Sequence, residues 1–169
     1  DELSEYEDSF DQIAVGEPLL TSDDDFEAVI SAITAHTESY CSDDTAIIFM
    51  GHGTEADSNS VYEKMQNMIS ADGFSDYYIG TVEATPSLED VIADATAGGY
   101  TKVVLEPLMV VAGDHANNDM AGDEEGSWKS EFTKAGFEVE CLLNGLGELP
   151  DIQKIYVSHV QTAISSLTE

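Results

Sequence analysis

The chain has 169 residues, 42% of them hydrophobic, so it is long enough for one domain with a core and too apolar to be disordered throughout. Its 35 Asp and Glu residues against 5 lysines give a formal charge of -30, which makes nucleic acid a very poor partner because phosphate binding needs a basic face. No apolar run reaches the roughly 20 residues of a membrane-spanning helix, so no membrane span is expected.

The first twenty residues give weak structural signals. Residues 1–11 are acidic and lack hydrophobic periodicity, which indicates an acidic tail or the stub of a preceding segment. A lobe with its own core is expected over residues 12–169. It begins with a short strand over Ile13–Leu20, placed at an edge of the sheet or leading into it because Gly16 and Pro18 weaken it.

Helices and strands alternate from residue 21 onward. Thr21 or Ser22 precedes three aspartates and an apolar stripe with helical spacing, which predicts a capped helix. Strands are predicted at residues 46–50, 77–82, 102–109 and 137–143. The first of these is a continuous apolar run, which is typical of a strand buried on both faces. Further helices are predicted over residues 58–70, from Pro86 to the glycines at 98–99, over residues 128–135, and from Pro150 onward.

This alternation predicts an α/β fold: a parallel sheet flanked by helices on both faces, in a Rossmann-type three-layer sandwich. The last helix is expected to pack through its apolar side chains, which are Ile152, Ile155, Tyr156, Val160 and Ile164. The two cysteines, Cys41 at a helix end and Cys141 within a strand, are expected to be a half-exposed thiol and a small core residue, and no disulfide is inferred.

Three chemically able residues follow three of the predicted strands. His52 follows the strand at 46–50, and Glu83 follows the strand at 77–82. His115 lies in the loop that follows the strand at 102–109. In an open parallel sheet the carboxyl ends of the strands meet at one edge, where ligands bind. Two imidazoles and a carboxylate suit a borderline divalent metal such as Co, Ni, Fe or Zn, and they can also move protons.

Each of these residues also has a simpler interpretation. A single histidine after a strand is often a loop or packing residue, and Glu83 could cap the helix predicted at Pro86. Asp114 and Asp119 either orient His115 as hydrogen-bond acceptors or cap the next helix. His36 and His159 lie in predicted helices and are expected to have surface or packing roles.

Several segments resemble those of a known family. They are GHG at 51–53, VEATP at 82–86, PLMVVAGDHANNDMAGD at 107–123, SWK at 127–129 and NGLGELP at 144–150. Together they resemble the class II tetrapyrrole chelatases, and within these the anaerobic sirohydrochlorin cobaltochelatases of cobalamin biosynthesis. The order and spacing of the segments fit from about residue 13 to 167.

The resemblance implies a two-lobed α/β fold with the tetrapyrrole bound between the lobes. It implies insertion of Co(II), the metal substrate, into sirohydrochlorin without a nucleotide, with Fe(II) or Ni(II) used by related members. The family's metal site, two histidines and a glutamate, falls on His52 of GHG, Glu83 of VE and His115 of GDHA, which are then both metal ligands and catalytic residues. These are the residues that the strand argument selects.

The matching segments resemble the second lobe of the long form of this family. Besides sirohydrochlorin, the partner that the resemblance implies is therefore a first-lobe chain or a homo-oligomer. A cytoplasmic location is expected, and the acidic composition would also suit an exported or high-salt setting. Three alternatives stay open: an iron or nickel chelatase of the same family, a haem-, tetrapyrrole- or metal-binding protein without turnover, and an acidic interaction fragment with no active site.

Overall fold

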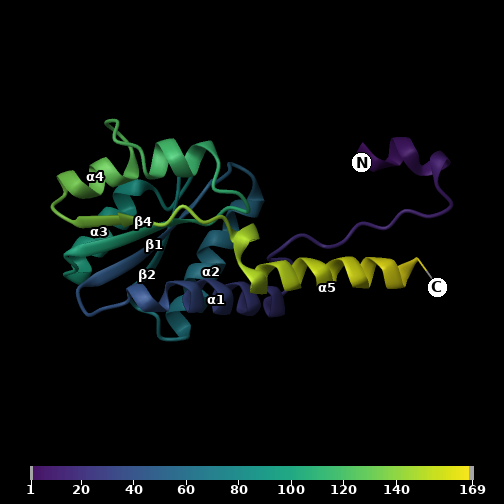
Figure 1. The fold of residues 1–169 in the computed structure, drawn as a ribbon, viewed down its shortest axis with the longest axis horizontal. Coiled ribbons are helices and arrows are strands. Elements are labelled where there is room, and N and C mark those ends of the chain that lie inside the picture. The colour runs from purple at the N-terminus through teal and green to yellow at the C-terminus, as the bar shows by residue number, and fades with distance from the viewer. Residues whose placement is uncertain (1, 168–169) are drawn as a thin grey trace.

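Four parallel strands form a sheet in residues 2–167, the part of the chain that the computed structural model describes (Figure 1). The order across the sheet is β2-β1-β3-β4. The strands are β1 (Thr45–Gly51), β2 (Tyr77–Thr81), β3 (Lys102–Pro107) and β4 (Glu138–Cys141). Every residue of the central strand β1 is buried, as its continuous apolar run predicts.

Helices cover both faces of this sheet, so the predicted three-layer α/β sandwich is confirmed. The helices are α1 (Asp23–Thr37), α2 (Ser60–Ala71), α3 (Leu88–Gly98), α4 (Trp128–Lys134) and α5 (Pro150–Ser166). Helices α1, α2 and α5 share one core with Ile47 and Val104 of the sheet, whereas α3 and α4 share the other with Ile48 and Leu105. Short 3₁₀ helices span Glu2–Ser9, Glu38–Tyr40, Asp57–Asn59 and Leu146–Glu148.

The starts of α1 and α3 are set by side chains that cap them. The hydroxyl of Ser22 accepts a hydrogen bond from the backbone N–H of Asp25, so the predicted cap of α1 is confirmed. The prediction that α3 starts at Pro86 is wrong. Pro86 follows a cis peptide bond in the preceding turn, and the helix begins after Ser87, which exchanges side-chain and backbone hydrogen bonds with Asp90 in a capping box.

The predicted strand over Ile13–Leu20 is also wrong. The segment runs beside α5 instead of joining the sheet (Figure 1). The carbonyl of Glu17 faces Nδ1 of His159 at 2.7 Å, and the backbone of Gly16 lies against that of His159. The backbone N–H and C=O groups of a helix are hydrogen-bonded within the helix, so a segment packed against it cannot form the hydrogen bonds of a β-strand with it. The prediction of an acidic tail over residues 1–11 stays a prediction.

Helix α5 extends past the body of the sheet (Figure 1). Ile152 in its first turn is fully buried, and Ile155 and Tyr156 pack against the core as predicted. The prediction that Val160 and Ile164 also pack is wrong, because these side chains are 54% and 55% exposed. Helical spacing places them on one face, but that face has no neighbour in the described residues. Across residues 2–167 no helix has the length and hydropathy that a transmembrane segment requires.

Candidate metal centre

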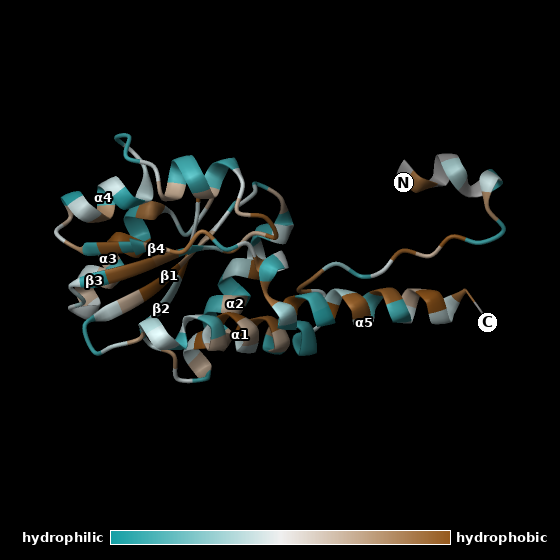
Figure 2. Ribbon diagram, in the orientation of Figure 1, coloured by the Kyte–Doolittle hydropathy of each residue, from teal (hydrophilic) through white to brown (hydrophobic). Residues whose placement is uncertain are grey.

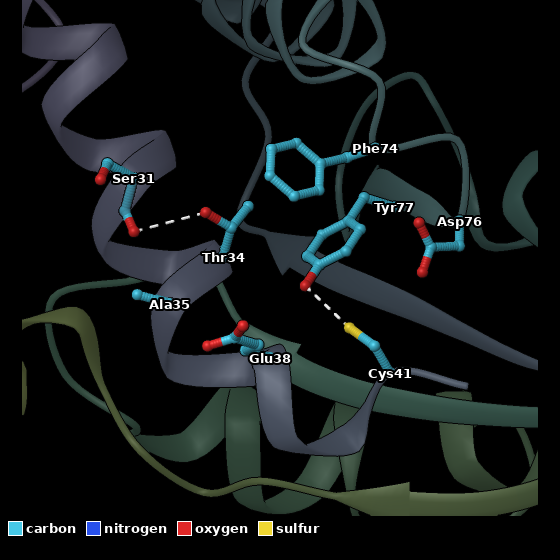
Figure 3. Close-up of a pocket in the computed structure, with 8 residues that line it drawn as sticks. All are labelled: Ser31, Thr34, Ala35, Glu38, Cys41, Phe74, Asp76 and Tyr77. Carbon is cyan, nitrogen blue, oxygen red and sulfur yellow. Dashed lines mark hydrogen bonds between the residues drawn. The ribbon is translucent and has the colours of Figure 1, made fainter.

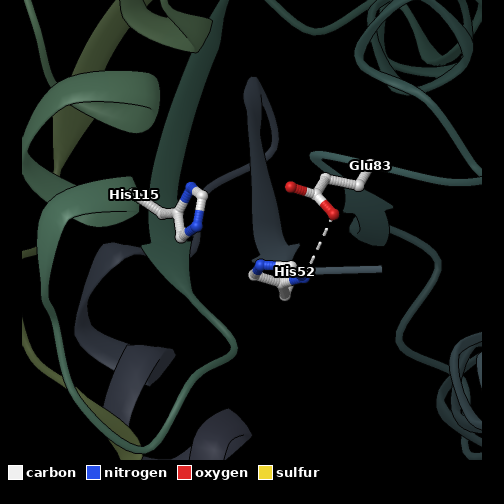
Figure 4. Close-up of side chains that lie close together, drawn as sticks. All are labelled: His52, Glu83 and His115. Atoms are coloured by element: carbon white, nitrogen blue, oxygen red, sulfur yellow. Dashed lines mark ion pairs between the residues drawn. The ribbon is translucent and has the colours of Figure 1, made fainter. Parts of the chain in front are cut away.

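The three predicted site residues lie together at the carboxyl ends of the strands (Figure 4). His52 follows β1, Glu83 follows β2, and His115 opens a helical turn after β3. Two backbone hydrogen bonds continue the pairing of β1 with β2: the N–H of Val82 donates to Gly51, and that of Glu83 donates to His52. One ligand atom from each of the three lies within 4.8 Å of the other two, so the predicted convergence is confirmed.

The side chains surround a common space between the strand ends (Figure 4). The rings of His52 and His115 stand edge to face, with centroids 4.7 Å apart and an interplanar angle of 89°. Nδ1 of His52 lies 3.8 Å from Oε2 of Glu83, an ion-pair contact, whereas the candidate ligand atoms of the three residues lie within 4.8 Å of one another. Ligand atoms around one divalent transition metal lie roughly 3–4 Å apart, since each metal–ligand bond is about 2.0–2.2 Å long. Small side-chain rotations would therefore bring the three ligands to a shared ion.

Hydrogen bonds orient both imidazoles. Nδ1 of His52 lies 2.9 Å from the carbonyl oxygen of Gly53, which can only accept, so this nitrogen carries the proton and Nε2 keeps its lone pair. Nδ1 of His115 lies 2.6 Å from Oδ2 of Asp119, an arrangement that likewise leaves Nε2 of His115 for a ligand. Each ring thus presents one nitrogen for metal or proton binding.

The two glycines around His52 are required by close packing. A Cβ at Gly51 would overlap the ring of Tyr62. Gly53 has a φ of +83°, and a Cβ there would lie 2.9 Å from the backbone nitrogen of Ala84. The loops that carry His52 and Glu83 therefore touch through Gly53, which holds the two ligands at their short separation.

His115 lies on a π-helical turn, His115–Met120, where the sequence predicts a loop. The N–H of Ala121 donates to the carbonyl of Ala116, five residues earlier, which is the π-helical pattern. The backbone of Gly122 then passes so close to Asn118 that a Cβ would overlap the Asn118 carbonyl. The apolar positions of this turn are too few to show a helical period, so the sequence does not predict it.

The two aspartates of this turn have different roles. Asp119 accepts from His115, as the orienting alternative predicts, whereas Asp114 accepts from the side-chain amide of Asn118. Neither caps α4, because the hydroxyl of Ser127 does so. The alternative in which Glu83 caps α3 fails in the same way, since Ser87 is that cap.

The candidate site is open. The side chains of His52, Glu83 and His115 are 47%, 57% and 35% exposed, so an ion or a flat molecule can reach them from solvent. A site with three protein ligands leaves further coordination positions free, as sites that exchange or activate a ligand require. Two imidazoles and one carboxylate would bind a borderline divalent metal.

Glu106 on β3 is an unusual buried group, and no sequence pattern distinguishes it from the exposed carboxylates. Its side chain is inside the core, and neither carboxyl oxygen has a hydrogen-bond partner in the described residues. Oε1 lies 3.5 Å from Nε2 of His36 on α1. Burial raises the pKa of Glu106 to about 8, because the core stabilises the neutral carboxyl over the carboxylate.

The remaining histidine and the cysteines lie away from the site. Nε2 of His159 faces Oδ1 of Asp25 at 2.9 Å and joins α5 to α1, which confirms a packing role. Cys141 is a partly buried free thiol in β4, and Cys41 is an exposed free thiol after α1.

A cavity of about 440 Å³ lies near the start of β2, at the edge of the sheet opposite the metal centre (Figure 3). In it the hydroxyl of Tyr77 lies 3.2 Å from Sγ of Cys41. None of the three candidate ligands lines it; the lining residues are Ser31, Thr34, Ala35, Glu38, Cys41, Phe74, Asp76 and Tyr77. The cavity is therefore separate from the metal centre.

The fold and the geometry of His52, Glu83 and His115 define an α/β lobe with an open candidate metal site at the carboxyl ends of its strands. The family model described as Cobalt chelatase (CbiK) matches residues 1–165. The chain belongs to this cobalt chelatase family.

Two curated relatives agree with this assignment. The sirohydrochlorin cobaltochelatase of Salmonella typhimurium is 36% identical over 160 residues, which are 95% of this chain and 60% of that protein. The sirohydrochlorin cobaltochelatase CbiKC of Nitratidesulfovibrio vulgaris is 33% identical over 163 residues, 96% of this chain and 57% of that protein. This chain therefore spans about three fifths of the length of these relatives.

The solved structure is a putative cobalamin (vitamin B12) biosynthesis CbiX protein from Marinobacter aquaeolei VT8. It aligns with a TM-score of 0.56 at 19% identity, over 74% of this chain and 98% of that one. At this identity the likeness shows the fold, and it agrees with the chelatase-like α/β sandwich that the sequence predicts.

Proposed function

We propose that this chain is the metal-binding lobe of a sirohydrochlorin cobaltochelatase, and that His52, Glu83 and His115 are its metal ligands and catalytic residues. The observation that carries the proposal is the placement of these three side chains within 4.8 Å at an open sheet edge, in a member of the cobalt chelatase family. The names of the two curated relatives support sirohydrochlorin as the tetrapyrrole and Co(II) as the metal substrate.

The reaction exchanges one Co(II) ion for the two protons of the inner N–H groups of the macrocycle. His52 and His115 would bind the incoming ion through Nε2 and, as the ion passes to the ring, take up the released protons as general bases. Glu83 would add negative charge, which favours both the divalent ion and the protonated imidazoles. The lobe contributes mainly orientation, by holding the ion where the ring nitrogens can approach it. No nucleotide is needed in this scheme.

The proposal includes a partner. The relatives are longer than this chain, so the tetrapyrrole would be enclosed with the help of a first-lobe chain or a second copy. Fe(II) and Ni(II) are alternative substrates, because two imidazoles and a carboxylate discriminate poorly between these ions. We further propose that the protein acts in the cytoplasm.

The test is anaerobic mixing of the chain with sirohydrochlorin and Co(II), with and without a first-lobe chain, followed by the absorption spectrum of the tetrapyrrole. His115→Ala should abolish insertion and Co(II) binding and leave the melting temperature nearly unchanged, because the side chain is on an open edge. His36→Ala removes an imidazole elsewhere and is the matched control. Unaltered insertion by His115→Ala would refute the proposed role.

A second outcome of the same experiment would favour the alternative without turnover. If the chain binds Co(II) or haem through His52 or His115 but never metallates sirohydrochlorin under any of these conditions, it is a binding protein. Absence of Co(II) binding at millimolar concentration would instead favour the third alternative, an interaction fragment without a site.

A further inference from the structure

The loops that carry His52 and Glu83 lie outside the core of the sheet. Strand β1 is hydrophobic and fully buried (Figure 2), whereas residues 54–59 and 83–87, which belong to the loops after β1 and β2, are exposed or half-buried. The ligands of one ion must be held within about 0.5 Å of their working positions, and core packing cannot do this for exposed loops. Other contacts must therefore fix the two loops relative to each other.

The side chain of Asn59 joins these two loops. Its Oδ1 accepts a hydrogen bond from the backbone N–H of Thr54 at 3.1 Å, and its Nδ2 donates to the carbonyl of Thr85 at 2.9 Å. A backbone N–H can only donate and a carbonyl can only accept, so the two partners determine which end of the amide faces which loop. Each contact lies two residues after a candidate ligand, His52 in one loop and Glu83 in the other. We call this pair of hydrogen bonds the Asn59 bridge.

Helix capping does not explain the Asn59 bridge. Asparagine is a favoured N-cap residue, and Asn59 directly precedes α2. An N-cap has an extended backbone, however, whereas the backbone of Asn59 is helical, with a φ of -59° and a ψ of -24°, and its side chain makes no cap hydrogen bond. Helices α1, α3 and α4, by contrast, are capped by serine side chains. Both polar ends of the Asn59 amide are thus used to join the two loops.

Tyr62 supports the same region from one turn further along α2. Its hydroxyl accepts a hydrogen bond from the N–H of Gly53 at 3.2 Å, and its ring occupies the space in which a side chain at Gly51 would lie. Asn59 and Tyr62 are three residues apart, so they lie on one side of the helix. Together they hold two consecutive backbone N–H groups of the first loop. Asn59 in addition reaches the loop that carries Glu83.

The Asn59 bridge is a second connection between the two loops. A backbone hydrogen bond from the N–H of Glu83 to the carbonyl of His52 joins the loops at the ligands themselves, at 2.9 Å. The bridge joins them again two residues further along each loop. Two connections fix the relative angle of the loops as well as their separation, which one connection cannot do.

We propose that Asn59 is a positioning residue of the metal centre, which fixes the distance between the ligand atoms of His52 and Glu83 by joining their loops. This role rests on the proposed function, because it takes these two residues to be ligands of one ion. Asn59 itself is not a ligand, since both ends of its amide are taken up by Thr54 and Thr85. Its effect on Co(II) binding is therefore indirect and depends on the complete bridge.

Titration of Co(II) by calorimetry and by its visible absorption tests this role in the intact chain. Asn59→Ala removes both hydrogen bonds and should raise the dissociation constant at least about tenfold, as loss of a group that orients a metal ligand usually does. The visible spectrum of the bound ion should also change, because it depends on the arrangement of the ligands. Asn67→Ala is the matched control: the same substitution at an exposed site about two turns further along α2 should change neither.

Asn59→Asp separates the bridge from the hydrogen bond to Thr54. A carboxylate still accepts from the N–H of Thr54, but it cannot donate to the carbonyl of Thr85. Its added negative charge would by itself favour Co(II) binding. We expect Co(II) binding to be weaker than in wild type in spite of that charge. Binding as tight as in wild type, with an unchanged spectrum, would overturn the role of the bridge.

Amide hydrogen exchange of the metal-free chain tests the bridge without any ligand. In Asn59→Ala the N–H of Thr54 loses its acceptor and should exchange faster. The N–H of Glu83 should also exchange faster, by about tenfold, because the loops separate more often. The N–H of Met65, inside α2, should keep its rate and so shows that the helix is intact. Unchanged exchange at both Thr54 and Glu83 would overturn the proposal.

These two experiments distinguish the role of Asn59 from the proposed function. A wild-type chain that binds no Co(II) would refute the metal centre, and the exchange rates would then decide alone whether Asn59 joins the loops. A wild type that binds Co(II), with Asn59→Ala binding it equally well, would keep the metal centre and refute the positioning role. Equal weakening by Asn59→Ala and Asn67→Ala would refute that role as well, because the second substitution leaves the bridge in place.

Discussion

Asp119 determines which nitrogen of His115 faces the candidate metal site. Its carboxylate accepts from Nδ1 at 2.6 Å, so the lone pair of Nε2 is the one left for a ligand. The π-helical turn places Asp119 one turn after His115, on the same side of the backbone. A carboxylate in this position also makes the imidazole a better electron donor to a metal.

Asp119→Ala should therefore weaken Co(II) binding by about 10- to 100-fold, the usual effect of removing the partner of a ligating histidine. Asp119→Asn should have a smaller effect, because its carbonyl oxygen still accepts from Nδ1. Titration of Co(II) by calorimetry and by its visible absorption measures both. Asp114→Ala is the control, since Asp114 bonds Asn118 and not His115, and an equal loss in that variant would contradict the assignment.

Glu106 is a residue whose burial has a measurable effect on stability. The pKa of a glutamate is ordinarily 4.5, and burial raises the pKa of Glu106 in the folded protein to about 8. Between these values the folded chain holds a proton that the unfolded chain has released. Unfolding then releases a proton, so the free energy of unfolding falls as the pH rises through this window, by up to about 1.4 kcal/mol per pH unit.

Glu106→Gln should remove this dependence. We expect the variant to be about as stable as wild type near pH 4.5 and more stable by about 2–4 kcal/mol near pH 8.5, because glutamine cannot ionise in the core. Urea unfolding at a series of pH values measures the difference. Glu138→Gln, on the exposed side of β4, controls for the loss of a carboxylate. A constant difference between wild type and Glu106→Gln at all pH values would contradict the explanation.

At the scale of elements, the geometry of the site depends on the contact between the loop after β1 and the loop after β2. Gly53→Ala should weaken Co(II) binding at least about tenfold, since a Cβ there would meet Ala84 at a position with positive φ and displace His52. Gly73→Ala is a matched control: its φ is +93°, but nothing lies within 4 Å of the added Cβ. Both variants should lose about 1 kcal/mol of stability from backbone strain, and only Gly53→Ala should lose metal affinity.

At the scale of the whole molecule, the acidic surface affects the proposed substrates in opposite ways. A body of charge -30 attracts Co(II) but repels sirohydrochlorin, which carries several carboxylates. Because salt screens both effects, raising the ionic strength from about 0.01 to 0.15 M should tighten binding of metal-free sirohydrochlorin and weaken that of Co(II). Fluorescence quenching and calorimetry measure the two affinities. Tetrapyrrole binding that weakens with salt would mean that local basic or backbone groups outweigh the net charge.

The layers of the fold and the position of the candidate site were predictable from local patterns. The apolar run of β1 predicts a strand buried on both faces, and parallel strands bring their carboxyl ends to one edge. That rule places His52, Glu83 and His115 along one edge of the sheet, whereas the strand order β2-β1-β3, which makes them neighbours, comes from the structure. The cap at Ser22 was equally predictable, because its hydrogen bond links residues that are close in sequence.

Other features depend on contacts between distant segments. The sequence does not decide which aspartate orients His115, because the positions of Asp114 and Asp119 depend on the path of a π-helical turn that shows no period in the sequence. The contact of Glu106 with His36 joins β3 to α1 and cannot be seen from either segment alone.

The sequence by itself determined the secondary structure of most of the chain and which side chains share each face, because hydrogen-bonded periodicity is a local property. Only the tertiary structure decided which of those faces are covered. The stripe at Val160 and Ile164 has the spacing of a packed helix, yet it is exposed because α5 runs beyond the sheet that would have covered it. Burial depends on what lies opposite a side chain, and helical spacing contains no information about that neighbour.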